Sequence, residues 1–370
     1  MSNEPVITPT QSSAPSHESR IHGCLLGGAL GDSLGYAVEF DDISAIRSKF
    51  GPDGLQDFSA LDGGSHFSDD TQLTLYTADG LLEALEWANS GVAADTNACL
   101  WLAYLRWLAT QGVPVPDAAP FQPSRWIDSH DVLKYRRAPG NACLSGLATG
   151  EMGTFFRPVN PDSKGCGTVM RSAPFGLIPF IAAEAVYKLS ADAASLTHGH
   201  PAARQGAGVF SLIIHALSNG QGLREAAEFA LGQLDAGQLH KDERVDQDLL
   251  ARLEAALRLG AAGALLDPEE LVRELGEGWV AEEALAVALY AVLATAPDPA
   301  AAGHPEAHFR AAIAVAVNHS GDSDSTASIA GNILGTFYGE ECLPADWLES
   351  LEAPEVIRGM ASRLAAVTGS

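Results

Sequence analysis

The sequence predicts an all-α fold: a single compact, orthogonal helical domain. Apolar residues recur at three- and four-residue spacing in seven segments, which is the periodicity of a helix with one buried face. Strand-like alternation of apolar and polar residues is nearly absent, and runs of β-branched residues are short. No Pro/Gly-rich stretch is long enough to separate two domains. The 370 residues therefore predict one large domain, although two or three domains of average size would fit that length.

The expected helices follow from this periodicity. In chain order they span residues 71–86, 98–108, 201–217, 223–234, 245–259, 282–294 and 308–317. Ser68 and Asp69 precede the first, Thr96 precedes the second, and Pro201 occupies the first turn of the third. These are positions that such residue types favour. Stretches rich in Pro and Gly predict loops at 51–65, 112–123, 157–166 and 297–304.

The N-terminal residues 1–19 are polar and rich in Pro, Ser and Thr, so we expect a disordered tail before a domain that spans 20–370. The tail lacks the apolar segment of a secretory signal, and no run of about 18 apolar residues predicts a membrane span. Five scattered cysteines without a CxxC pair disfavour a disulfide framework or a zinc knuckle. We therefore expect a cytoplasmic protein, and a monomer.

The net charge excludes several classes of partner. The chain carries 22 Lys+Arg and 47 Asp+Glu, a formal net charge of −25. Such a surface repels phosphate backbones and anionic lipid, so we expect no general nucleic-acid binding and no membrane association. An anionic ligand would need backbone N–H groups or metal ions to hold it.

Two acidic clusters stand at predicted helix starts, FSDDTQ at 67–72 and GDSDST at 321–326. Each combines carboxylates with hydroxyls, the hard oxygen ligands that suit Mg²⁺ and Mn²⁺. The alternative is that these residues are ordinary helix N-caps. Two such clusters in one chain favour a shared two-metal site, because together they supply enough oxygen ligands for two ions. The candidate ligands are Ser68, Asp69, Asp70, Asp322, Asp324 and Ser325.

Two glycine-rich motifs are weaker signals. GGALGDSLG at 27–35 places glycines on one helical face, and the small residues after the second acidic cluster do the same, so both predict close helix packing. Glu39, just beyond the first motif, is a candidate acid or base, or a surface side chain. KGCGTVMR at 164–171 offers backbone N–H groups to a diphosphate, or is an ordinary turn. Its Arg171 could pair with a phosphate or with a buried carboxylate.

These motifs, in this order, resemble the ADP-ribosylglycohydrolases, which include dinitrogenase-reductase-activating glycohydrolase and the ADP-ribosyl-acceptor hydrolases. The resemblance runs from about residue 21 to 339 through GCLLGGALGDSLG, FSDDTQ, PGNACLSGL, GCGTVMR, LTHGHP and NHSGDSDSTASIAGNILGTFYG. It implies a compact all-α domain of the ADP-ribosylglycohydrolase type with a central cleft and a binuclear metal centre. Cys166 stands where many members have Asn, and Ala138 where nitrogenase-directed members keep an acidic residue.

The resemblance also implies roles for the matching residues. It makes the six candidate ligands of the acidic clusters the ligands of two Mg²⁺ (or Mn²⁺) ions. The implied catalytic carboxylates are Asp69, Asp70, Asp322 and Glu39, with Glu39 beside the substrate ribose. The implied substrate contacts are the backbone of Gly167, Thr168 and Val169 to the diphosphate, and Asn141 and His198 along the ADP-ribose cleft.

The implied activity is metal-dependent hydrolysis at the anomeric carbon of the distal ribose, which releases ADP-ribose from an acceptor. The partner would be an ADP-ribosylated protein or a small-molecule ADP-ribosyl conjugate, and the N-glycosidic arginine linkage is favoured. Hydrolysis of O-linked (serine) or small-molecule conjugates is the alternative within enzymes. A catalytically silent ADP-ribose-binding regulator and a Ca²⁺-stabilised structural domain are alternatives of other classes.

Overall fold

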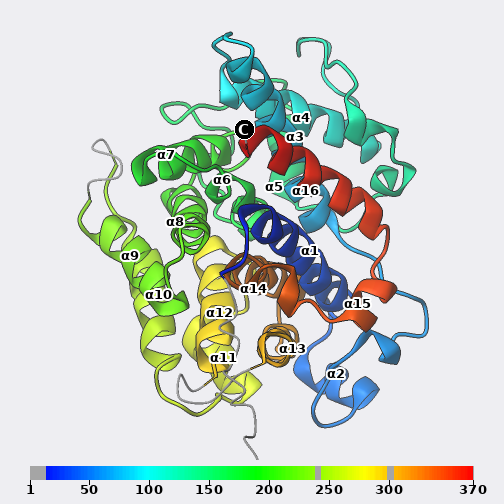
Figure 1. Ribbon diagram of the computed structural model, residues 1–370, viewed down its shortest axis with the longest axis vertical. Helices are drawn as coiled ribbons and strands as arrows, with labels where there is room; N and C mark the ends of the chain where they lie inside the picture. Colours follow the sequence, from blue (N-terminus) through cyan, green and yellow to red (C-terminus); the bar gives the residue numbers. More distant parts are fainter. Residues whose placement is uncertain (1–13, 238–242, 298–303, 370) are drawn as a thin grey trace, which may run out of the picture.

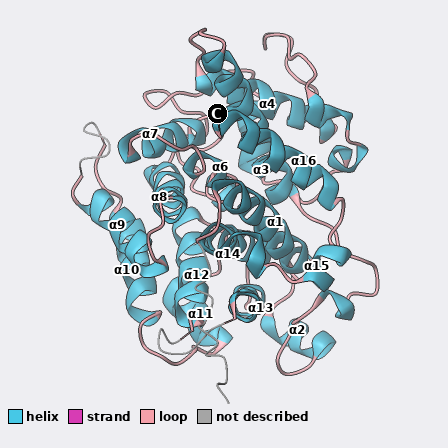
Figure 2. Ribbon diagram, in the orientation of Figure 1, coloured by secondary structure: helices cyan, strands magenta, loops and turns pink. Residues whose placement is uncertain are grey.

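The computed structural model describes residues 14–237, 243–297 and 304–369. Within them the chain forms helices joined by loops and no strand, so the predicted all-α fold is confirmed (Figure 2). The α-helices are α1 (His17–Tyr36), α2 (Ile43–Phe50), α3 (Asp69–Asn89), α4 (Thr96–Thr110), α5 (Asn141–Leu147), α6 (Ala173–Gly176), α7 (Ala183–Ala194), α8 (Pro201–Ser218), α9 (Leu223–Asp235), α10 (Gln247–Leu259), α11 (Pro268–Leu275), α12 (Ala281–Ala294), α13 (Pro305–Val317), α14 (Ser323–Tyr338), α15 (Ala345–Ser350) and α16 (Pro354–Thr368). The 3₁₀ helices are η1 (Phe58–Ala60), η2 (Trp126–Ser129), η3 (Asp131–Lys134), η4 (Cys166–Thr168) and η5 (Gly339–Cys342).

All seven helices predicted from periodicity are present, as α3, α4, α8, α9, α10, α12 and α13, with ends within three residues of the predicted ones. Among the helices of at least 12 residues, the prediction missed α7 and α16, and it also missed the shorter helices α2, α5, α6, α11 and α15. The N-cap residues of α7 and α16, Ala182 and Ala353, provide no side-chain hydrogen bond to the first turn. Helix α16 does begin with Pro354 in its first turn, a start signal that the prediction overlooked.

Two predicted boundaries differ from the structure. The tail is predicted to extend through residue 19, but α1 begins at His17, because the Ser16 hydroxyl accepts the backbone N–H of Ser19 at 3.1 Å and caps the helix. Similarly, α4 is capped by Asp95 rather than Thr96. Residues 1–13, and residues 298–303 of a predicted loop, lie outside the described residues.

Helices α1 and α14 form an antiparallel pair at the centre of the molecule (Figure 1). The predicted close packing is confirmed, because their small residues face one another. A Cβ atom at Gly31 would lie 2.1 Å from the carbonyl oxygen of Ala327, and one at Gly27 would lie 2.5 Å from that of Gly331. Any larger side chain at these positions would therefore push the two backbones apart.

The other helices pack around this pair. In Figure 1, α8 to α12 lie on one side of it, and α3, α4 and α16 lie on the other. Contacts of α14 with α8 and α12, and of α1 with α3 and α16, join both groups to the centre. Because α1 and α14 run antiparallel, the C-terminal end of α1 lies next to the N-terminal end of α14. None of the helices in the described ranges is both long and apolar enough to cross a membrane.

Candidate active site

Three helix ends meet beside a cleft of about 660 Å³. The side chains that line it include Glu39 after α1, Asp69 and Asp70 at the start of α3, and Asp322, Asp324 and Ser325 at the start of α14. The two acidic clusters thus face one cavity, although a long stretch of chain separates them in sequence. This juxtaposition follows from the antiparallel packing of α1 against α14.

The start of α3 is held in place by Asp32 on α1, a residue that the sequence analysis did not single out. The completely buried Asp32 carboxylate accepts the backbone N–H of Ser68 at 2.9 Å and that of Thr71 at 3.0 Å. Burial raises the pKa of Asp32 to about 6, against the effect of these hydrogen bonds. The sequence signal that could have identified Asp32 is an acidic residue among the small residues of a helix that is buried on every face.

Both proposed readings of the acidic clusters describe part of the structure. Ser68 is the N-cap of α3, where its hydroxyl accepts the N–H of Asp70 at 3.1 Å, and Asp322 is the N-cap of α14. Ser68 has no exposed surface and does not line the cleft. Asp69, Asp70 and Asp324 are not caps, and their carboxylates face the cavity. The Ser325 hydroxyl donates to Asp70 at 2.9 Å, which links the two clusters directly.

The cleft has an excess of negative charge. Burial, together with repulsion from neighbouring acids, raises the pKa of Asp69, Asp70 and Asp324 well above the ordinary value. Burial and repulsion from Asp322 also raise the pKa of Glu39 to about 9, and its Oε2 has no hydrogen-bond partner. No Lys or Arg of the described chain forms an ion pair with these carboxylates.

Uncompensated carboxylates that share a cavity fit divalent cations, because positive charge would remove their mutual repulsion. Among the described residues, however, no three Asp, Glu, His or Cys side chains converge on one point as a ready-made ion site. The donor set therefore suits hard cations, and the acids would have to draw together around them.

The predicted substrate contacts divide into two groups. Asn141, Gly167 and His198 line the cleft. Thr168 and Val169 lie behind it: the Thr168 hydroxyl donates to the carbonyl of Ala203 at 2.8 Å, and the Val169 N–H donates to that of Cys166 at 2.8 Å. Residues 166–168 close into the 3₁₀ helix η4, so the Val169 N–H is used inside the chain, as expected if this part of the motif is a turn.

His198 is buried and uncharged. Burial and the nearby Arg171 lower the pKa of its imidazole to about 3, and its Nδ1 lies 2.8 Å from the Thr197 hydroxyl. Of the two partners considered from the sequence, a carboxylate is not found: no ion pair joins Arg171 to an acid of the described residues. Arg171 donates to Thr197 at 2.7 Å, and its guanidinium lies 4.4 Å from the centre of the Tyr104 ring. Arg171 therefore supports the wall of the cleft.

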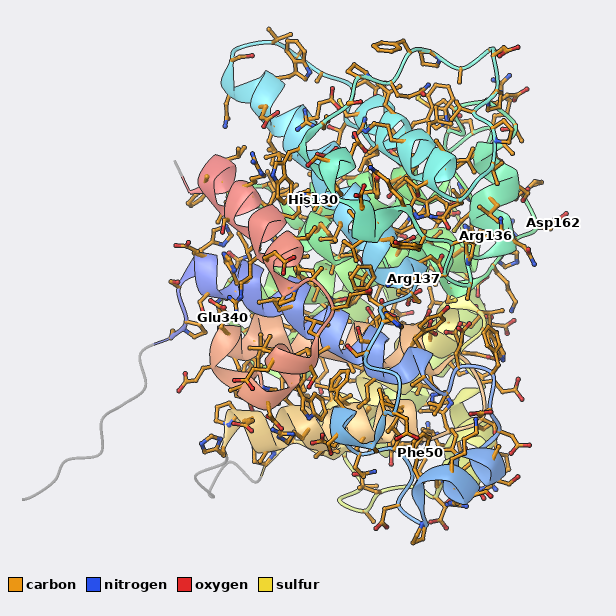
Figure 3. The ribbon with its side chains drawn as sticks, turned by 90° about the vertical axis from the view of Figure 1, so that its right-hand side faces the viewer. Phe50, His130, Arg136, Arg137, Asp162 and Glu340 are labelled. Atoms are coloured by element: carbon orange, nitrogen blue, oxygen red, sulfur yellow. The ribbon has the colours of Figure 1, made fainter. Side chains whose placement is uncertain are left out.

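Other residues of the cleft carried no clear sequence signal. Phe40 and Trp279 come from segments that are distant in sequence, and their rings stack with centroids 6.3 Å apart. Arg136 also lines the cleft, whereas the adjacent Arg137 turns inward, pairs with Glu352 and donates to the carbonyl of Phe67 at 2.9 Å (Figure 3). No periodicity or short motif marks these contacts, because each depends on loops that are distant in sequence.

Comparison with known proteins agrees with the fold and the motifs. A profile of the ADP-ribosylglycohydrolase family matches residues 13–370. The chain therefore belongs to the ADP-ribosylglycohydrolase family, which confirms the resemblance seen in the motifs. It is 27% identical to human ADP-ribosylhydrolase ARH3, with 91% of this chain and 90% of that protein covered. The zebrafish (Danio rerio) ARH3 is 26% identical, with 94% of this chain and 90% of that protein covered.

Two further similarities extend to more distant proteins. The ADP-ribosyl-[dinitrogen reductase] glycohydrolase of Rhodospirillum rubrum is 23% identical over 96% of this chain and 98% of that protein. A solved structure described as an ADP-ribosylglycohydrolase-related protein complex superposes with a TM-score of 0.62 at 23% identity, over 95% of this chain and 99% of that one. This second similarity supports the fold.

Proposed function

We propose that the protein is a metal-dependent hydrolase that releases ADP-ribose from an acceptor by cleaving the glycosidic bond at the distal ribose. The observation that carries the proposal is the convergence of Asp69 and Asp70 from α3 with Asp322 and Asp324 from α14 in one cleft, where no Lys or Arg of the described residues forms an ion pair with them. Family membership supplies the substrate class. We further propose that it acts as a monomer in the cytoplasm.

The carboxylates of the two clusters and Ser325 would hold two Mg²⁺ or Mn²⁺ ions. When bound, these ions supply positive charge that balances the acids, binds the sugar hydroxyls and makes a nearby water more acidic. Asp69, Asp70, Asp322 and Glu39 are the groups that could accept or return a proton at the anomeric carbon and the leaving atom. Of these, Glu39 alone stands outside both clusters, and its Oε2 has no partner.

The remainder of ADP-ribose would lie along the other wall of the cleft. Asn141 and Gly167 line it there, and the neutral His198 imidazole offers ring nitrogens for hydrogen bonding without adding charge. Arg171 holds this wall through Thr197, so it would orient the substrate only indirectly. Gly167 is suited to a diphosphate, because a Cβ there would lie 2.9 Å from the sulfur of Cys143, so only a glycine brings its backbone to the cleft wall at this position.

Two observations bear on the acceptor. Glu39 stands outside both metal-binding clusters and could face a positively charged guanidinium, so we propose arginine-linked ADP-ribose as the preferred substrate. Arg136 at the same cleft brings a positive charge that would repel a guanidinium, and it favours the O-linked serine or small-molecule conjugates as the second candidate.

The test is release of free ADP-ribose from arginine-linked and serine-linked peptides, with Mg²⁺, with Mn²⁺ and with EDTA. Asp322→Asn should abolish release, whereas Asp131→Asn, at an acid whose side chain is 88% exposed, should behave as the unmodified protein does. Metal-dependent release from one linkage supports the hydrolase and identifies the acceptor. Tight ADP-ribose binding without release from any conjugate would instead indicate the silent regulator.

A further inference from the structure

Cys166 brings a sulfur atom to the acidic cluster. It is the first residue of η4 and lines the cleft, and it is half-buried whereas the other four cysteines are buried. Its position is set by the backbone, since its N–H donates to the carbonyl of Trp279 at 3.2 Å and the preceding Gly165 forms a bridge with Val280. Backbone contacts between residues 165–166 and residues 279–280, which are distant in sequence, therefore hold the thiol at the cleft.

The neighbours of this thiol are oxygen ligands. The Cys166 Sγ donates to Oδ2 of Asp322 at 2.9 Å and lies 3.5 Å from the hydroxyl of Ser325, which in turn donates to Asp70 at 2.9 Å. A sulfur and an oxygen that bind one cation at bond lengths of about 2.3 and 2.1 Å lie about 3.1 Å apart at a right angle and about 3.6 Å apart at the tetrahedral angle that Zn²⁺ favours. Because the Cys166–Asp322 separation is 2.9 Å, the two atoms would have to move apart by about 0.2 Å for the first angle and about 0.7 Å for the second to hold a cation between them.

A second, independent group points to the same place. Glu39 is 8% exposed, lines the cleft, and has an Oε2 atom without any hydrogen-bond partner. Asp322 lines the same cleft, and its charge is among those that raise the pKa of Glu39. A buried carboxylate oxygen without a partner needs a proton, a water or a cation.

We propose that Cys166 and Asp322 form a mixed sulfur–oxygen site through which the cleft takes a thiophilic divalent cation, such as Zn²⁺, Cd²⁺ or Co²⁺, in addition to hard cations. The cation replaces the proton between Sγ and Oδ2, and that proton leaves to the buffer. Thiolate ligands select softer metals, whereas carboxylates alone suit Mg²⁺. The inference rests on the proposed function, because Asp322 belongs to both sites. Cys166 thus biases this chain toward softer ions.

The test is a Co²⁺ titration of the full-length protein followed by absorption spectroscopy and calorimetry. We expect a sulfur-to-cobalt charge-transfer band in the near ultraviolet that is absent in Cys166→Ser and Cys166→Ala. Cys143→Ser is the matched control: this cysteine lines the same cleft, but its sulfur contacts Arg171 at 3.6 Å and no carboxylate. It should retain the band. Cd²⁺ affinity should fall by about tenfold or more in Cys166→Ser, with Mg²⁺ affinity much less affected.

The outcomes separate this inference from the function on which it rests. Co²⁺ binding with visible cobalt bands but no charge-transfer band in the unmodified protein overturns the sulfur ligand and leaves the two-metal hydrolase standing. A band that persists in both folded Cys166 variants also overturns it. If calorimetry detects no binding of Co²⁺, Mg²⁺ or Mn²⁺, both proposals fail. The first and third outcomes are measured on the unmodified protein alone. They can therefore overturn the inference even if a Cys166 variant misfolds.

Discussion

The carboxylate of Asp32 on α1 accepts the backbone N–H of Ser68, the N-cap residue of α3, at 2.9 Å, and so joins the central helix pair to the first acidic cluster. The same Asp32 carboxylate accepts the N–H of Thr71 one turn later, at 3.0 Å. The direction in which Asp69 and Asp70 point therefore depends on a side chain that does not itself line the cleft.

Asp32→Asn tests this role. The amide would replace one of the two acceptor oxygens by an N–H₂ donor, which would lie against the backbone N–H of Ser68 or of Thr71. We expect the free energy of unfolding to fall by about 1–3 kcal/mol and ADP-ribose release to fall more steeply than stability does. Denaturant unfolding and a turnover assay at a temperature where the variant remains folded give both values. Unchanged turnover in the folded variant would contradict the positioning role.

The contact between α1 and α14 predicts strong sensitivity to added volume. Gly31→Ala should lower the free energy of unfolding by about 1–3 kcal/mol or more, because the new Cβ would lie 2.1 Å from the backbone oxygen of Ala327. Gly232→Ala on α9 is the matched control, since a Cβ there meets no atom within 4 Å. It should be neutral or stabilising by up to about 1 kcal/mol. Equal effects of both substitutions would argue against the close packing.

The Arg137–Glu352 pair predicts a second positioning effect. Arg137 pairs with Glu352, donates to the carbonyl of Phe67, and accepts the N–H of Asp69 on its own carbonyl at 3.2 Å. Glu352→Gln should weaken this connection, lower kcat through misplacement of Asp69, and change the stoichiometry of bound Mg²⁺ little. Arg137→Lys should lower kcat as well, because a lysine cannot make the paired contacts of a guanidinium.

A control for this prediction is the exposed Lys134–Asp131 pair nearby. Lys134→Ala should change stability by less than about 1 kcal/mol and leave kcat unaltered. If Glu352→Gln and Lys134→Ala gave the same kcat, the pair near Phe67 would have no role in the site.

His308 predicts a pH dependence of stability away from the cleft. Burial lowers the pKa of this imidazole, whose Nε2 lies 2.9 Å from the carbonyl of Val292. In the unfolded chain His308 binds a proton with an ordinary pKa of about 6.5, whereas in the folded chain it binds that proton only at lower pH. The contribution of His308 is therefore present above that pH and is lost as the pH falls below it, by at most about 1.4 kcal/mol per pH unit.

The measurement is denaturant unfolding of the unmodified protein and of His308→Gln between pH 5 and pH 7.5. The variant should lose stability less steeply below about pH 6.5. His304→Gln is a suitable control, because that residue is exposed at the start of α13. Parallel curves for the unmodified protein and the His308 variant would show that burial does not perturb this histidine.

Much of the site could be inferred from the sequence because its acids stand in local motifs. FSDDTQ and GDSDST each carry an N-cap and the acids of one helix start, and short-range rules describe that arrangement well. Local reasoning left two interpretations open at 164–171, and only the structure shows that residues 166–168 close into η4. The same reasoning missed Asp32 and Arg137, whose partners lie far along the chain.

By itself the sequence determined the helical class, seven of the helices and the residue types of the acidic clusters, since periodicity and capping act within a few residues. Only the tertiary structure decided that the two clusters face one cleft, that Cys166 lies beside Asp322, and that Glu39 has an oxygen without a partner. The physical reason is that these relationships depend on the antiparallel contact of α1 with α14 and on loops from distant segments. Such contacts are set by packing across the whole domain rather than by neighbouring residues.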